Sequence, residues 1–158
     1  MYIEVIQEKY SNNLKSLFDF NIGGNLIYMW NSLDTEFGDK FTLDYKDKRK
    51  LFLELIEYYM RKGMLKFLDG EVATEIEKTI EKETYKYRIQ KRLMWHERNS
   101  IEQTIAHFNL LLPAGDEDNF LESSDIHAFC SLCVPIASYY HDGTLEEYPQ
   151  NEWIAADY

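Results

Sequence analysis

Two histidines and two cysteines near the carboxyl end of the chain have the residue types and spacing of a zinc site. His127, Cys130, Cys133 and His141 follow the pattern His-x2-Cys-x2-Cys-x7-His, which supplies four ligands of the kind that zinc prefers. Against this, a Cys-x2-Cys pair is common by chance, and a proline and a predicted strand precede the second histidine. The run of residues 129–140 is also strongly apolar. We therefore expect both cysteines to be buried core thiols without a metal, and no cofactor.

Redox chemistry at the same cysteine pair is the other alternative. A thioredoxin-type motif needs a helix that starts directly after a strand, and a thiolate stabilised by the helix dipole or by a nearby cation. The last lysine or arginine of the chain is Arg98, so no fixed cation lies close in sequence to Cys130 or Cys133. The sequence therefore argues against a redox role.

Other catalytic patterns are not met by this sequence. His96-Glu97 lacks the second histidine that a metalloprotease helix requires four residues further on. No serine stands in a Gly-x-Ser-x-Gly elbow. Glu146 and Glu147 could act as an acid and a base, but neighbouring residues of a strand point to opposite faces. We expect that the protein is not an enzyme.

The charge of the chain is distributed very unevenly. All 17 lysines and arginines lie within residues 1–98, where acids balance them, so the net charge of −11 belongs to residues 99–158. Such a field attracts cationic partners and repels nucleic acid and anionic lipid. The basic runs, such as residues 46–50, alternate with acids and are expected to be solvated helix faces. The sequence thus predicts an acidic docking face; the alternative is that the acidity serves solubility alone.

The composition is that of one globular domain over residues 1–158, with 45% hydrophobic and 28% charged residues. The first residues lack the basic region and apolar run of a signal peptide, and no stretch approaches about 18 uninterrupted apolar residues. We expect a cytoplasmic protein that does not bind membranes or nucleic acid. The oligomeric state is left open.

Two helices have complete start and stop signals. The first covers residues 44–62, where Asp44 can cap the first turn and Gly63 can end the last one. The second begins with the capping box of Ser100 and Gln103 and closes at Pro113. Each has apolar residues three and four positions apart: Leu51, Phe52, Leu55, Ile56 and Tyr59 in the first, and Ile101, Ile105, Phe108 and Leu112 in the second.

The remaining elements are predicted from weaker patterns. One helix is expected over residues 3–17, and a shorter one, capped by Asn25, over residues 26–33. Residues 64–68 and a hairpin over residues 136–145 are expected as strands. Residues 71–98 fit either a long helix or a strand, and a helix through about Glu83 followed by a strand is favoured. The predicted class is α+β: a mainly helical N-terminal two thirds with a small antiparallel sheet whose strands are mostly C-terminal.

This order of elements resembles small bacterial immunity proteins of contact-dependent growth inhibition and related polymorphic toxin systems. Several of these families have a helix, a glycine, a lysine-bearing strand, and later a tryptophan before a helix that ends at proline. The chain departs from them in a charged insertion at about residues 72–91 and in its N-terminal helices. The segments that carry the resemblance are residues 51–58, 63–67, 94–95, 100–105, 139–143 and 152–154, together with Pro113.

The resemblance implies a cytoplasmic inhibitor that binds a cognate toxin domain tightly and needs no catalysis. A toxin that cuts nucleic acid has a basic cleft, and carboxylates of the inhibitor would lie where phosphates otherwise sit. The alternatives are a zinc-binding regulatory protein and an acidic adaptor of an endogenous basic protein. The predicted contacts are carboxylates with aromatic anchors: Asp116, Glu117, Asp118, Glu122, Tyr140, Glu146, Glu147 and Tyr148.

Overall fold

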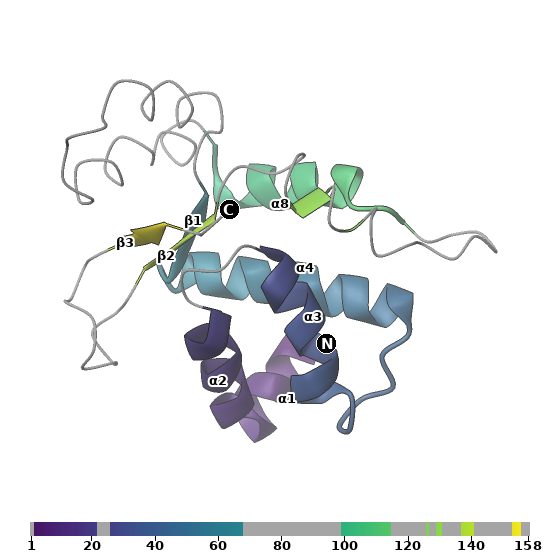
Figure 1. Cartoon of the computed structure of the whole chain (residues 1–158). Coiled ribbons are helices and arrows are strands. Elements are labelled where there is room, and N and C mark those ends of the chain that lie inside the picture. Colours follow the sequence, from purple (N-terminus) through teal and green to yellow (C-terminus); the bar gives the residue numbers. More distant parts are fainter. Residues whose placement is uncertain are drawn as a thin grey trace.

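The fold is described from a computed structural model, which defines residues 2–21, 26–67, 99–114, 126, 129–130, 137–140 and 153–155. Five helices hold most of these residues, and three short strands form a ribbon beside them (Figure 1). The helices are α1 (Tyr2–Lys9), α2 (Ser11–Asn21), α3 (Leu26–Phe37), α4 (Tyr45–Arg61) and α8 (Ile101–Leu111), and the strands are β1 (Leu65–Phe67), β2 (Ala137–Tyr140) and β3 (Trp153–Ala155).

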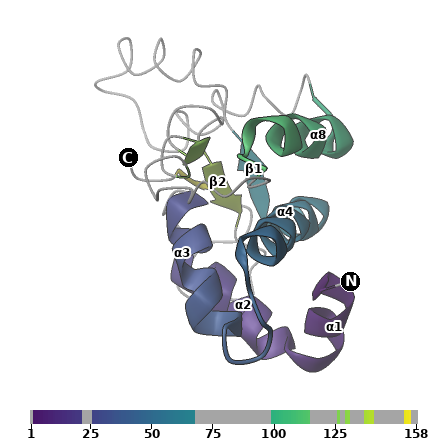
Figure 2. The ribbon, with the colours of Figure 1, turned by 90° about the vertical axis from the view of Figure 1, so that its right-hand side faces the viewer.

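Helix α4 is the centre of the fold. It lies between α8 on one side and the three N-terminal helices on the other (Figures 1 and 2). Its start is as predicted, because Asp44 Oδ1 accepts a hydrogen bond from the Asp47 backbone N–H at 2.9 Å. Because α4 has neighbours on both sides, it buries seven side chains: Leu51, Phe52, Leu53, Leu55, Ile56, Tyr59 and Met60.

The N-terminal helices pack on α4 through aromatic side chains. Trp30 of α3 meets Phe52 edge to face with ring centres 5.3 Å apart, and Phe18 of α2 lies 5.2 Å from Tyr59. The buried Tyr59 hydroxyl donates a hydrogen bond to the Leu14 carbonyl at 2.8 Å. This bond satisfies the polar end of a side chain that is otherwise surrounded by apolar groups.

The predicted N-terminal helix is divided in two at Tyr10, which lies between α1 and α2. The apolar spacing was a sound guide to burial, since Ile6, Leu14 and Leu17 are all in the core. The spacing gave no sign of the break. Helical hydrogen bonds also continue on both sides of it, since the Tyr10 N–H donates to the Ile6 carbonyl and the Leu14 N–H donates to the Tyr10 carbonyl. The break lets α1 and α2 pack on different parts of the helical core (Figure 2).

The three strands form an antiparallel ribbon in the order β1-β2-β3. Gly63 makes the turn from α4 into β1 with a φ of 70°, a conformation that glycine adopts at little cost. Leu65 stands opposite Tyr139, and Tyr139 stands opposite Ile154 on its other side. Phe67 then packs edge to face against Phe108 of α8, with ring centres 4.8 Å apart.

The α+β class predicted from the sequence is corrected to a mainly helical one. The strands are only three and four residues long and add Leu65 and Phe67 to the core, whereas the helices run from 8 to 17 residues and supply most of its side chains. The apolar patterns in the sequence located the strands, but they did not show that the strands would be too short to form the main part of the fold. The expected helix or strand over residues 71–98, the Asn25 cap and the Asp142-Gly143 turn lie outside the described residues.

In the part of the chain that the structure describes, no helix combines the length and the apolar character needed to cross a membrane.

Candidate partner-binding surface

Helix α8 opens the lysine- and arginine-free part of the chain, and it is held on α4 at both ends by arginines of α4. Arg49 reaches the carboxyl end of α8, and Arg61 reaches its amino end. The two helices therefore run antiparallel. Between the arginines, α8 buries Thr104, Phe108 and then Leu112 just past its last turn.

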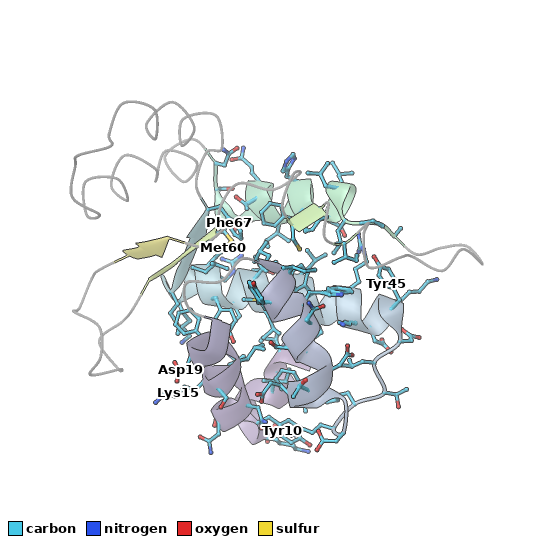
Figure 3. The ribbon with its side chains drawn as sticks, in the orientation of Figure 1. Tyr10, Lys15, Asp19, Tyr45, Met60 and Phe67 are labelled. Carbon is cyan, nitrogen blue, oxygen red and sulfur yellow. The ribbon has the colours of Figure 1, made fainter. Side chains whose placement is uncertain are left out.

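The carboxyl end of α8 is clamped by the Arg49 guanidinium. Its Nη2 donates to the carbonyls of Asn109 at 2.8 Å and Leu112 at 3.1 Å, its Nε to the carbonyl of Pro113 at 3.1 Å, and its Nη1 to Asn109 Oδ1 at 3.0 Å. The Tyr45 hydroxyl adds a 2.5 Å bond to the Pro113 carbonyl (Figure 3 shows Tyr45 near one end of α4). A helix end leaves carbonyls that favour a cation. Since residues 99–158 contain no lysine or arginine, α4 provides the cation.

The amino end of α8 carries the capping box that the sequence predicts. The Gln103 N–H donates to Ser100 Oγ at 3.1 Å, and the Ser100 N–H donates to Gln103 Oε1 at 2.8 Å. The Glu102 carboxylate lies 2.9 Å from the Arg61 guanidinium. Hydrogen bonds lower the pKa of this carboxyl, first that from the backbone N–H of Glu102 and then those with Arg61 and Ser100. Hydrogen bonds to Glu57 and Glu102 raise the pKa of Arg61. Both Glu102 and Arg61 are half exposed or more, so this pair is weak.

The outer face of α8 exposes two leucines in its last turn. Leu110 is 84% exposed and Leu111 is 38% exposed, while their neighbours Phe108 and Leu112 are buried. Scattered exposed apolar residues are common in proteins. Here, however, two of the three large exposed apolar residues in the described part of the chain are adjacent, and the third is Tyr28 on α3.

Most of the predicted partner contacts lie outside the described residues. The exception is Tyr140, whose backbone ends β2 opposite Trp153 of β3. Their roles therefore remain predictions. The seven contacts outside the described residues are Asp116, Glu117, Asp118, Glu122, Glu146, Glu147 and Tyr148.

One member of the possible zinc set is described, and its surroundings suit a core thiol. Cys130 is 6% exposed, and burial raises the pKa of its thiol to about 12. Such a thiol is neutral at ordinary pH, whereas redox chemistry uses the thiolate. His127, Cys133 and His141 lie outside the described residues. Among those that are described, no group of three or more His, Cys, Asp and Glu side chains could hold a metal ion.

The basic run of residues 46–50 is more engaged than the expected solvated face. Lys48 has a side chain only 12% exposed, lies 4.6 Å above the ring of Trp30 and bonds Asp34 at 2.6 Å. Arg49 forms the clamp on α8. Sequence inspection missed both roles, because the partners are 14 or more positions away along the chain.

An open surface depression of about 460 Å³ follows α3, lined by Asp34 and residues 38–43. Its two carboxylates are both in ion pairs, Asp34 with Lys48 and Asp39 with Lys40 at 2.9 Å. Lys40, through its hydrogen bond and its charge, lowers the pKa of Asp39. Both carboxylates are thus engaged in surface ion pairs. The described lining of the depression offers no buried acid–base pair for catalysis.

Comparisons of the chain with protein-family models, with curated protein sequences and with solved structures found no match.

Proposed function

We propose that the chain is an immunity protein, without catalytic activity, that binds and neutralises a cognate basic toxin domain in the cytoplasm. The distribution of charge supports this most directly: the net charge of −11 resides in residues 99–158, which contain no lysine or arginine. A surface of one sign raises the rate at which an oppositely charged protein arrives and rejects partners of like charge.

The packing of α8 is compatible with such a role. The arginines of α4 that reach α8 bind its last carbonyls and Glu102. Four hydrogen bonds from Arg49 and one from Tyr45 hold the last turn of α8 and Pro113. The end of this helix therefore loses little conformational entropy when a partner binds against it.

The partner suggested by this charge is a nuclease-type toxin domain. Its active site would be basic in order to hold phosphates, and carboxylates of the inhibitor can occupy the same positions. Asp116, Glu117 and Asp118 form the densest acidic run, and they are proposed as the principal contacts. Glu122, Glu146 and Glu147 are further proposed contacts, with Tyr140 and Tyr148 as aromatic anchors.

Growth rescue tests the proposal. The C-terminal domain of the large protein encoded immediately upstream is expressed with this chain, without it, and with an unrelated acidic protein as control, while culture density is followed. We expect the domain alone to stop growth, this chain to restore it, and the complex to survive purification. If the domain is harmless, or if it kills equally in all three cultures, the proposed function is wrong.

A further inference from the structure

We infer that the outer face of α8, with Leu110 at its centre, is an apolar anchor for the basic partner protein. This inference rests on the proposed function and adds the part of the surface that charge does not explain. Leu110 is 84% exposed and Leu111 is 38% exposed, and they are the last two residues of the helix.

The exposure of Leu110 is not needed to build the helix. The positions that pack on the core are Ile101, Thr104, Ile105, Phe108 and Leu112, which recur every three or four residues. Leu110 lies off that stripe, on the side that also exposes Gln103 and Ala106. A polar residue at position 110 would leave this packing intact, so the leucine at this place has no structural purpose in the described fold.

The rigid mounting of this turn makes it suited to be an anchor. Arg49 binds the Asn109 side chain and carbonyl on one side of Leu110 and the Leu112 and Pro113 carbonyls on the other. A leucine held in place in this way can enter an apolar pocket without further ordering of its backbone. A few side chains carry most of the binding energy of an interface, and they are those that fill a well-packed, desolvated pocket of the partner.

The net charge of the chain selects the occupant of this face. The chain carries a net charge of −11, and from Asn99 onward its only fixed charges are carboxylates, so two copies of it would repel each other. A basic protein with an apolar pocket within its positive surface is complementary to both features. The face is thus assigned to that partner rather than to a second copy of this chain.

Affinity measurements on one exposed side chain test the assignment. The probe is the C-terminal domain of the upstream protein, separated from its complex, and its affinity is measured for wild type, Leu110→Ser, Leu110→Met and the control Tyr28→Ser. Tyr28 is 55% exposed on another helix, so it matches the loss of exposed apolar surface. We expect Leu110→Ser to bind about 10- to 100-fold more weakly, with Leu110→Met and Tyr28→Ser within about threefold of wild type.

The outcomes separate this inference from the proposed function. If wild type binds and Leu110→Ser binds as tightly, the anchor is wrong while the function stands. If wild type does not bind, both are wrong. Sedimentation of the free protein at low and high salt provides a further check: a dimer that Leu110→Ser abolishes would assign the face to a second copy and overturn the inference. Unfolding of each variant in urea shows that the fold is retained.

Discussion

Cys130 links the stability of the protein to alkaline pH. Burial raises the pKa of its thiol to about 12 from an ordinary value of 9.0. As the pH rises above about 9, the thiol ionises in the unfolded chain while the folded protein keeps its proton. The unfolded state then binds fewer protons than the folded state, so stability falls with pH between about 9 and 12.

We therefore expect the free energy of unfolding to fall by about 1 kcal/mol per pH unit through this thiol. Urea unfolding at pH 8, 9 and 10 measures the free energy of unfolding of two proteins. The parent carries Cys133→Ser alone, and the variant carries Cys133→Ser together with Cys130→Ala. At pH 8 the parent is the more stable protein, and its advantage shrinks as the pH rises. Parallel losses in the two proteins, which other titrating groups would cause, would contradict the prediction.

Two glycines differ in what a methyl group would meet. A Cβ at Gly63 would have no atom within 4 Å, but the φ of 70° strains any L-residue there. We expect Gly63→Ala to cost about 1 kcal/mol of stability, and Gly63→Asn less, since asparagine tolerates this conformation. At Gly38 a Cβ would lie 2.3 Å from the Asp34 carbonyl oxygen, so Gly38→Ala should cost more than Gly63→Ala. Thermal unfolding ranks the three variants, and an equal loss at both glycines would refute the ranking.

At the scale of the elements, the two arginines of α4 hold α8 with unequal strength. Arg49 makes four hydrogen bonds to the end of α8, three of them to carbonyls that close the helix. Arg61 makes surface ion pairs to Glu57 and Glu102 from a side chain that is 50% exposed. Exposed pairs contribute little because water competes and the side chains lose freedom.

Arg49→Met should accordingly destabilise the protein by about 2 kcal/mol, and Arg61→Met, the matched control, should destabilise it clearly less. Hydrogen exchange should show faster opening of α8 in the Arg49 variant, since the helix loses its cation and the bonds to Leu112 and Pro113. Urea unfolding gives the free energies. Similar losses in the two variants would show that the clamp is no stronger than the surface pairs.

At the scale of the whole molecule, the charge of residues 99–158 should govern how fast a basic partner arrives. Replacement of Asp116 by Asn, Glu117 by Gln and Asp118 by Asn should lower the association rate about tenfold at low salt and flatten its dependence on ionic strength. The control neutralises three exposed acids of the balanced region, Glu4, Glu8 and Asp39. Stopped-flow binding to the toxin domain measures both. Identical rates and salt slopes for the two triple variants would remove the acidic run from the interface.

Local signals in the sequence were sufficient for α4 and α8. Asp44, Gly63 and the Ser100–Gln103 box act within four residues of a helix end, so their effect does not depend on the rest of the fold. The same holds for the apolar spacing that placed Phe108 and Leu112 in the core. The buried state of Cys130 followed from the apolar run around it.

Signals that depend on distant partners were not available from the sequence. Arg49 looks like one more charge in a basic run until its partners, 60 or more positions away, are known. Leu110 looks like core in a run of three leucines, although the helical stripe through Phe108 and Leu112 leaves it on the opposite side and could have revealed it. The predicted acidic contacts stay predictions for the same reason, since exposure is a property of the assembled chain.

The uneven charge, the two capped helices and the apolar positions of the core can be read from the amino-acid order alone. Tertiary structure decided the mainly helical class, the division of the first helix at Tyr10, and the pairing of Arg49 and Arg61 with the two ends of α8. The physical reason is range. Caps and periodicity act over one or two turns, whereas the length of a layer and the partner of a charge depend on which segments meet in space.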